Sequence, residues 1–401
     1  MAAPATNASP IVDWVIDVDT HITEPPDLFS SRLPAKWKDL APKIQMNDRG
    51  YEEWVVGNMS PITPVGHTAT AGWKNPFPDA PSTFAECPTA SHDAHARLDY
   101  MDSLAIWAMA LYPNVGGFGS QVFLGLEDPA LMLACVQAYN DFLTDWASPA
   151  PERFIPIAAL PFWDVEASVK EIERCAAKGH KGILFTGEPQ SHGMPVLANP
   201  HWNPLWEAAQ AHDMPVSFHI GAGNFTGEAY WTEERIEHYG PGGVNGMFTT
   251  GLFLDNAKQI VDILFSGVLA RYPKLKVISV ESGVGFIPFL LESCDYTFDY
   301  GRVREQRPEM TLKPSEYFER QVYACYFFEE YAPASLMNRI PVDNILFETD
   351  YPHPVCLYGN VREKIDAGLG EAKPDTRRKL LFDNAARIYD VGAPNRAPSL
   401  G

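Results

Sequence analysis

The 401-residue chain is predicted to fold as a single (β/α)8 barrel domain spanning residues 1–401. Eight short, apolar and β-branched segments recur along it, and longer segments with a helical hydrophobic period separate them, as in successive βαβ units. The short segments are apolar throughout instead of alternating, which is typical of parallel strands covered on both faces. Eight such units in a chain of this size favour a closed barrel over an open sheet.

The predicted strands are bounded by turn residues, and the predicted helices lie between them. The strands are expected at 14–19, 105–112, 154–160, 182–187, 215–220, 275–281, 321–327 and 344–350. The clearest helical segments are 128–146, 164–178, 203–213 and 256–272. Each of the last three ends a few residues before a strand, as αβ loops usually do. No GxGxxG motif follows the first strand, which argues against a nucleotide-binding sheet.

Two regions interrupt this rhythm. Residues 30–100 form an insertion after the first strand that is rich in Pro, Gly, Asp and Trp, with a small hairpin expected at 49–58. Residues 222–250 are expected to form a long irregular loop after the fifth strand. Both follow strand C-termini, where barrel enzymes build their active sites, so both are candidate lids or pocket walls. Surface decoration and an oligomer contact are the alternatives.

The overall composition is that of a soluble protein with a large core. The chain is 46% hydrophobic and 20% charged, and its formal net charge is -20. Such an acidic balance argues against binding to nucleic acid or to anionic membrane surfaces. The six cysteines show no CxxC spacing, and neither a signal peptide nor a membrane-spanning apolar run is evident. The cytoplasm is therefore the expected compartment.

Polar side chains end four of the predicted strands. The first strand runs into Asp19 and His21, the fifth ends in His219, the sixth in Glu281 and the eighth in Asp350. In a barrel these ends share one rim, and Asp19 and His21 lie on the same side of an extended segment. The two imidazoles and two of these carboxylates form a ligand set suited to one divalent ion such as Zn or Mn.

Each of these residues also has a purely structural explanation. Asp19 is compatible with an ordinary turn, His219 with a hydrogen-bonded core histidine, and Asp350 with the cap of a following helix. Their joint occurrence at strand ends favours the metal site. Lys181 precedes the fourth strand, which is not where a lysine bridging two metals would lie, so one metal is preferred to two.

Several motifs together carry a resemblance to a known family. They are DVDTHITEP (17–25), ARLDYMDSL (96–104), FIPIAALPF (154–162), KGILFTG (181–187), PVSFHIG (215–221), ESGVGFIPFLLE (281–292), LFETDYPHP (346–354) and FDNAARIY (382–389). The sequence resembles the amidohydrolase-related branch of the amidohydrolase superfamily, which includes aminocarboxymuconate-semialdehyde decarboxylase and nonoxidative benzoate decarboxylases. The resemblance implies metal ligation by Asp19, His21, His219 and Asp350.

The chain departs from this family in two places. Many members have His-x-His after the first strand, whereas Asp19 replaces the first histidine here. A carboxylate there resembles the Glu-x-His of the benzoate decarboxylases and moves the preference toward Mn or Mg relative to Zn. Glu281 occupies the place of a frequent catalytic histidine, where it would act as general acid or base, or orient a ligand.

The remaining candidates lie beside these ligands. His353 is expected above the metal, where it would bind a substrate carboxylate, relay a proton, or only brace the loop before Pro354. Glu24 is a candidate partner of the first-strand ligands.

Three functions remain open from the sequence. The first is decarboxylation of a small aromatic or conjugated carboxylic acid, in which Glu281 or His353 delivers the proton. The second is hydrolysis of an amide, lactone or related bond by a metal-activated water, which the missing histidine favours. The third is a binding or scaffold protein on an inactive barrel. The expected partner is a small molecule, and the family resemblance implies a homodimer.

Overall fold

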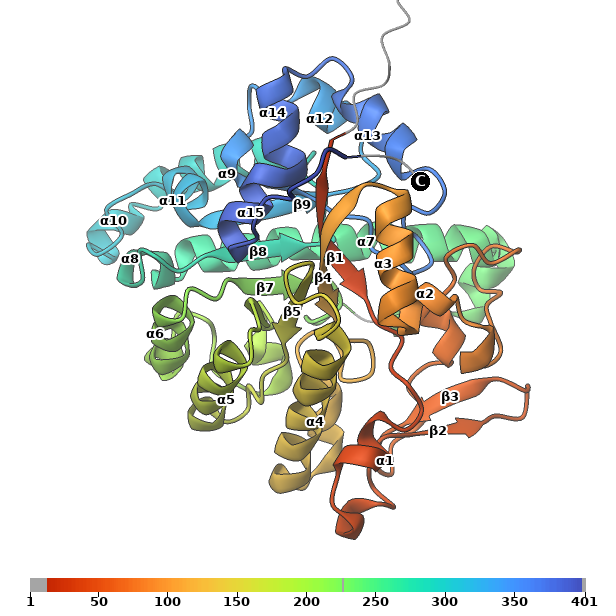
Figure 1. Cartoon of the computed structure of the whole chain (residues 1–401). Coiled ribbons are helices and arrows are strands. Elements are labelled where there is room, and N and C mark those ends of the chain that lie inside the picture. Colours follow the sequence, from red (N-terminus) through yellow and green to blue (C-terminus); the bar gives the residue numbers. More distant parts are fainter. Residues whose placement is uncertain (1–12, 226, 399–401) are drawn as a thin grey trace, which may run out of the picture.

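Eight parallel strands form the core of the molecule. The computed structural model describes residues 13–225 and 227–398. Its main sheet has the order β1-β4-β5-β6-β7-β8-β9-β10, so each strand pairs with the next one along the chain (Figure 1). The strands are β1 (Val15–His21), β4 (Ile106–Tyr112), β5 (Phe154–Ala158), β6 (Gly182–Leu184), β7 (Val216–His219), β8 (Val277–Val280), β9 (Val322–Tyr326) and β10 (Ile345–Phe347).

The sheet closes on itself between its first strand and the end of its last. Thr20 and Tyr351 form a parallel bridge, and the Tyr351 carbonyl accepts a hydrogen bond of 2.7 Å from the His21 amide. The Asp350 amide donates to the Asp19 carbonyl at 2.9 Å. These contacts join β1 to the residues just after β10, at the rim where both strands end. The predicted (β/α)8 barrel is therefore confirmed.

Alternate residues of the strands face opposite sides. Ile16 and Val18 of β1 and Ile278 and Val280 of β8 belong to a hydrophobic cluster inside the barrel. Val15, in contrast, packs in the larger cluster between the strands and the surrounding helices. Because both faces bury apolar side chains, the strands read as continuous apolar runs in the sequence.

Helices surround the strands and begin where the sequence offers caps. The Asp128 carboxylate accepts hydrogen bonds from the Ala130 and Leu131 amides, and Asp164 accepts one from the Ala167 amide. The first nine helices are α1 (Leu28–Arg32), α2 (Thr89–His92), α3 (Ala94–Ser103), α4 (Pro129–Ala147), α5 (Val165–Ala177), α6 (Asn203–Ala211), α7 (Glu233–Phe265), α8 (Val268–Arg271) and α9 (Ile287–Tyr300). The others are α10 (Val303–Gln306), α11 (Pro314–Gln321), α12 (Tyr331–Ser335), α13 (Val361–Leu369), α14 (Pro374–Arg378) and α15 (Asn384–Tyr389).

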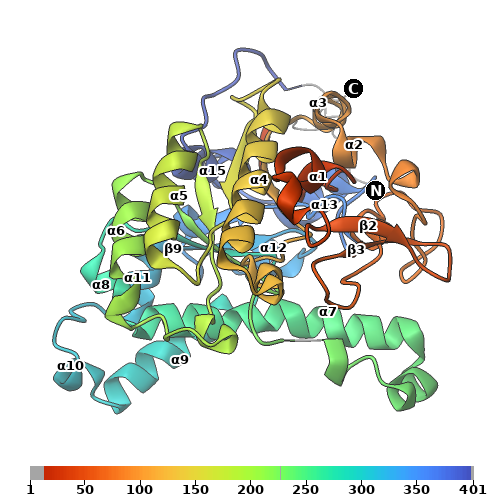
Figure 2. The ribbon, with the colours of Figure 1, turned by 90° about the horizontal axis from the view of Figure 1, so that it is seen from below.

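The predicted long loop after the fifth strand is wrong. From Glu233 the chain is helical, and α7 continues to Phe265 as a 33-residue helix with one break at Gly240 (φ 71°, ψ 160°). The expected helix at 256–272 is the last third of α7 followed by the short α8. Pro241 and the glycines near it obscured the helical period. Figure 2 shows α7 running along one side of the molecule and extending beyond the barrel.

The insertion after β1 contains more regular structure than its composition suggests. The expected hairpin is present, but its first strand lies earlier than predicted, because β2 (Lys43–Met46) pairs antiparallel with β3 (Glu52–Val55). The last part of the predicted insertion is α3, the helix that leads into β4. Among the described residues, no helix is both long and apolar enough to cross a membrane.

Candidate metal centre

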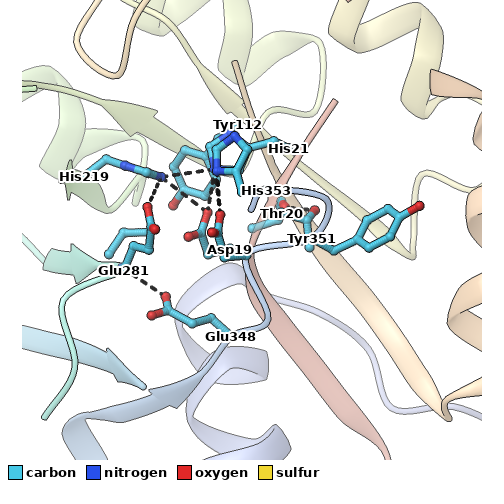
Figure 3. A network of polar contacts seen from close by, with 12 residues as sticks. Asp19, Thr20, His21, Tyr112, His219, Glu281, Glu348, Tyr351 and His353 are labelled. Atoms are coloured by element: carbon cyan, nitrogen blue, oxygen red, sulfur yellow. Dashed lines mark hydrogen bonds and ion pairs between the residues drawn. The ribbon is translucent and has the colours of Figure 1, made fainter. Parts of the chain in front are cut away.

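Five side chains from the ends of four strands meet at the rim of the barrel. Asp19 and His21 end β1, His219 ends β7, Glu281 follows β8 and Asp350 follows β10. Figure 3 shows Asp19, His21, His219 and Glu281 pointing toward a common centre. Overlapping groups of three, namely Asp19–His21–His219, His21–Asp350–His353 and Asp19–Glu281–Asp350, each place their ligand atoms within 4.8 Å of one another.

The distances between the ligand atoms suit a small cation. The His21 Nε2 atom lies 3.4 Å from Asp19 Oδ1, 3.4 Å from Asp350 Oδ1 and 3.3 Å from His219 Nε2. His219 Nε2 lies 3.5 Å from Asp19 Oδ1. Atoms bound tetrahedrally at about 2.1 Å from a zinc ion lie about 3.4 Å from each other. The predicted ligands therefore have the spacing of a metal site.

Backbone carbonyl groups set the tautomers of both histidines. His21 Nδ1 lies 3.1 Å from the Pro113 carbonyl, and His219 Nδ1 lies 2.9 Å from the Ile220 carbonyl. Since a carbonyl only accepts hydrogen bonds, each Nδ1 carries the proton of the neutral ring. Both Nε2 lone pairs then face each other and the surrounding carboxylate oxygens. This arrangement is repulsive unless a cation lies between them.

The carboxylate oxygens have the same requirement. Both side-chain oxygens of Asp19 and of Asp350 are buried and make no hydrogen bond within the described part of the chain. Buried oxygens of this kind are costly unless they are protonated or bind a cation. Two imidazole nitrogens and carboxylate oxygens are donors that Zn and Mn accept. The residues present therefore fit a divalent metal ion.

The pKa values of the carboxyl groups respond to their crowding. Burial, followed by the charges of Asp350 and Asp19, holds the pKa of Glu281 well above its usual range. Burial and the Asp19 charge raise the pKa of Asp350. Burial by itself would raise the pKa of Asp19, but the nearby His219 and His21 side chains outweigh burial and lower this pKa. In the metal-free protein, this crowding therefore favours the ionised form of Asp19 and the protonated form of Glu281.

Glu281 and Asp350 share an uncommon backbone conformation. Their φ angles are 59° and 60°, in the left-handed region that side chains other than glycine seldom adopt. Such conformations persist where the surrounding structure enforces them, often at functional sites. Nearby, the Asp17 carboxylate accepts hydrogen bonds from the Thr349 amide at 2.9 Å and the Thr349 hydroxyl at 2.6 Å. Asp17 thereby ties the segment before Asp350 to β1.

His353 lies beside the cluster and is held on both sides. Its ring stacks on His21 with centroids 3.8 Å apart, and its Nδ1 lies 2.7 Å from Asp350 Oδ1. Its Nε2 lies 2.8 Å from Asn114 Oδ1, while Asn114 Nδ2 donates to the Ile22 carbonyl. This bond fixes the Asn114 oxygen toward His353, so Nε2 donates and the Nδ1 lone pair faces Asp350. Burial lowers the pKa of His353 to about 3.

Other residues support the site without having been singled out from the sequence. The Arg97 guanidinium is fully buried and donates to the His21 carbonyl at 2.8 Å. Phe118 stacks on His219 with centroids 4.2 Å apart and forms an apolar cover. Glu348 accepts a hydrogen bond from the Glu281 amide at 3.2 Å. Arg97 and Glu348 occur inside family-like motifs, but no local signal marks Phe118.

Glu24 contributes one step away from the metal ligands. Its carboxylate accepts hydrogen bonds from the Asn114 amide at 2.6 Å and the Val115 amide at 3.0 Å. It thus holds the loop after β4, which carries the partner of His353. The expectation that Glu24 contacts the first-strand ligands remains a prediction.

A cavity of about 230 Å³ opens beside the candidate metal ligands, with Glu281 and Asp350 in its wall. The insertion after β1 supplies part of the cavity wall, and α7 with the segment before it supplies another part. These two parts meet where the rings of Phe77 and Trp231 pack edge to face, with centroids 6.4 Å apart. The lining residues are Thr63, His67, Phe77, Ile220, Trp231, Asn245, Phe248, Thr249, Leu252, Glu281, Asp350, His353, Pro354 and Val355. Half of them are apolar or aromatic, and three of the polar ones, Glu281, Asp350 and His353, belong to the metal-site end.

Comparison with known sequences finds one family and several relatives. Residues 16–391 match a family model described as amidohydrolase. A gamma-resorcylate decarboxylase of Polaromonas sp. is 27% identical over 306 residues, which cover 74% of this chain and 86% of the relative. A 2-amino-3-carboxymuconate-6-semialdehyde decarboxylase of Dictyostelium discoideum is 24% identical over 391 residues, which cover 95% and 92%.

Solved structures share the fold of the chain. An amidohydrolase from Mycobacterium avium subsp. paratuberculosis superimposes with a TM-score of 0.72 at 24% identity, covering 94% of this chain and 100% of that one. A dihydroxybenzoic acid decarboxylase from Polaromonas sp., solved with manganese and the inhibitor 2-nitroresorcinol, gives a TM-score of 0.60 at 20% identity, covering 96% and 98%.

Proposed function

This chain belongs to the amidohydrolase family, and from that membership we propose that it is a metal-dependent, nonoxidative decarboxylase of a small aromatic or conjugated carboxylic acid. The relatives described above are decarboxylases by name. One observation carries the proposal for this chain: the metal cluster forms one end of a cavity whose remaining wall is largely apolar and aromatic. Such a wall suits a planar ring whose carboxylate faces the cation.

Asp19, His21, His219 and Asp350 are the proposed ligands. Their Nε2 lone pairs and unpaired oxygens face one centre, which supports a single divalent ion, Zn or Mn, as the cofactor. A metal bound there would neutralise the substrate carboxylate and stabilise the electron-rich ring as a Lewis acid.

Glu281 is the proposed acid that delivers a proton to the ring carbon. Its carboxyl group borders the cavity, and burial, which raises its pKa in the metal-free protein, favours the protonated form that a general acid needs. Loss of CO2 leaves an electron pair on the ring carbon, and the Glu281 proton forms the new C–H bond there. His353 Nε2 donates to Asn114 Oδ1, and its Nδ1 lies 2.7 Å from Asp350 Oδ1, so both ring nitrogens face protein groups, which supports a positioning role for His353.

Product analysis tests this proposal. Metal-loaded protein is incubated with hydroxybenzoic acids and, separately, with amides and lactones of similar size, and the released CO2, amine and acid are quantified. Decarboxylation is expected, and Glu281→Gln is expected to lower kcat by about 10²–10⁴ while retaining the metal. Release of hydrolysis products alone would favour the alternative, in which a metal-activated water cleaves the substrate and Glu281 takes its proton.

We also propose that the chain acts in the cytoplasm as a homodimer. All six cysteines are free, which fits a reducing compartment. Phe289, Tyr296 and Tyr300 are 76%, 70% and 81% exposed on one helix, α9, at spacings that place them along one side of it. Exposed aromatic side chains of this kind often mark a protein interface. Light scattering of the wild type and of Tyr296→Glu tests the dimer: we expect the wild type to have the mass of a dimer and the variant that of a monomer. Equal masses for the two proteins would contradict this interface.

A further inference from the structure

The cavity contains few groups that could bind a second negative charge. Among the described residues that line it there is neither a lysine nor an arginine. The carboxyl groups in its wall are those of Glu281 and Asp350. A substrate carboxylate at the metal would be neutralised there, but a second carboxylate farther along the ring would contact no cation in the wall, because Arg49, whose charge acts on His67, is exposed and lies outside it. Burial of an unpaired charge is strongly unfavourable.

His67 offers a neutral polar group on a different wall of the cavity. It belongs to the insertion after β1, and its ring packs edge to face on Phe77 at 5.2 Å and on Tyr51 at 6.3 Å. Burial and the nearby Arg49 lower its pKa, so the ring is neutral at physiological pH. Arg49 is exposed and lies outside the cavity wall. His67 comes from the insertion after β1, whereas the proposed metal ligands come from β1, β7 and the segment after β10.

The ring nitrogens of His67 are available to a ligand. Its backbone amide donates to the Pro64 carbonyl, but within the described chain its imidazole makes no hydrogen bond. A neutral imidazole has one donor and one acceptor, which matches a hydroxyl group. The cavity is also large enough for a substituted ring, because a cavity of about 150 Å³ already holds benzene and this one measures about 230 Å³.

We propose that the cavity selects aromatic monocarboxylic acids with an uncharged hydrogen-bonding substituent on the side of the ring away from the carboxylate, and that His67 binds this substituent. The inference rests on the proposed decarboxylase function and specifies its substrate class. His67 acts as a specificity-determining residue and takes no part in the chemical step.

Equilibrium binding to manganese-loaded protein tests the proposal with three probes. They are 2-hydroxybenzoate, 2,4-dihydroxybenzoate and 2-hydroxyterephthalate, which carry hydrogen, hydroxyl and carboxylate opposite the first carboxylate. We expect the dihydroxy acid to bind about tenfold more tightly than 2-hydroxybenzoate, as one added hydrogen bond allows. The dicarboxylate is expected to bind about tenfold more weakly than 2-hydroxybenzoate, because its second charge is unpaired.

Variants of the wall assign the preference to one residue. His67→Leu should reduce the gain from the 4-hydroxyl group to about twofold or less, while changing the affinity for 2-hydroxybenzoate by no more than about threefold. His67→Gln, which retains a donor and an acceptor, should keep most of the preference. Thr63→Val is the matched control, since Thr63 lines the same cavity and comes from the same insertion. It should leave the preference intact.

The outcomes separate this inference from the proposed reaction. Loss of the preference in Thr63→Val, its persistence in His67→Leu, or its absence in the wild type would each overturn the inference. Equal affinity for the dicarboxylate and the dihydroxy acid would also overturn it. CO2 release is recorded in the same samples. If the predicted binding pattern appears without CO2 release, the reaction is wrong and the His67 assignment stands.

Discussion

At the scale of single residues, the proposed metal centre consists of side chains whose nitrogen and oxygen atoms face one point and make no hydrogen bonds there. The Nδ1 atoms of His21 and His219 donate to the Pro113 and Ile220 carbonyls, and within the described chain the Asp19 and Asp350 oxygens accept no hydrogen bond. A metal ion bound there would supply the positive charge that these atoms lack. Removing a single ligand should therefore affect the metal more than the fold.

His219→Ala and Asp350→Asn are expected to retain the fold and to lose most of the bound metal. Asn tolerates the left-handed backbone of Asp350 but lacks its charge. Elemental analysis after dialysis measures the metal, and circular dichroism checks the fold. His201→Ala, at an exposed histidine remote from the centre, is the control and should keep full occupancy. Full occupancy in His219→Ala or Asp350→Asn would contradict the ligand set.

We expect Asp19 to set the preference of the proposed ligand set between manganese and zinc. Asp19→His restores the His-x-His pattern of many relatives and replaces an oxygen donor with nitrogen. The ratio of the manganese to the zinc dissociation constant is expected to rise by about tenfold or more, because nitrogen donors favour zinc. Competitive titration with a chelating dye measures both constants, and Asp19→Glu should leave the ratio nearly unchanged. A ratio that is equal in all three proteins would refute this role of Asp19.

At the scale of elements, the long helix α7 joins the barrel to one wall of the cavity. Its helical course is interrupted at Gly240, whose φ of 71° and ψ of 160° are accessible almost only to glycine. The α7 residues that line the cavity lie between Asn245 and Leu252 and therefore follow this break. Gly240 therefore sets the direction of the first turns of α7 relative to the cavity-lining part.

Two glycines of α7 are expected to respond oppositely to alanine. Gly240→Ala should lower the free energy of unfolding by about 1–3 kcal/mol, because alanine is strained at this φ and ψ. Gly246→Ala should raise it by about 0.4–1 kcal/mol, since Gly246 is helical and a Cβ atom there meets open space. Urea denaturation measures both. Stabilisation by Gly240→Ala would show that the break is not enforced by the fold.

At the scale of the whole molecule, the buried carboxyl groups link stability to the metal and to pH. Burial raises the pKa values of Glu281, Glu348 and Asp350 in the metal-free fold. A group whose pKa is higher in the folded state stabilises the fold below its unfolded pKa, about 4 for carboxyl groups. This stabilisation is lost as the pH rises through the folded pKa.

Metal removal should therefore lower Tm, and the loss should grow as the pH rises above about 4. In the metal-loaded protein the cation offsets the carboxylate repulsion at neutral pH. Scanning calorimetry with and without a chelator, across a series of buffers, measures the two Tm values. An identical Tm with and without chelator at neutral pH would show that the carboxyl groups do not depend on a metal.

The sequence alone determined the strands, their order and the polar residues at their ends. Apolar runs such as 215–220 are local patterns, and the alternation of strand and helix restricts their topology to few arrangements. In a parallel barrel the C-terminal ends of all strands share one rim, so the sequence alone predicts that Asp19, His219 and Asp350 lie close together. The aspartate caps of α4 and α5 are equally local, which explains why these helices were predicted within a residue or two.

Only the tertiary structure decided the features that depend on contacts distant in sequence. The tautomer of His21 depends on the Pro113 carbonyl, and the orientation of His353 depends on Asn114. The cavity joins residues 63–77, 231–252 and 350–355, whose proximity no local periodicity encodes. The helix through 233–250 was missed because its glycines and Pro241 weaken helical propensity, which packing of α7 against the barrel overrides. Local patterns thus specify the elements, whereas burial and long-range contacts specify the chemistry of the site.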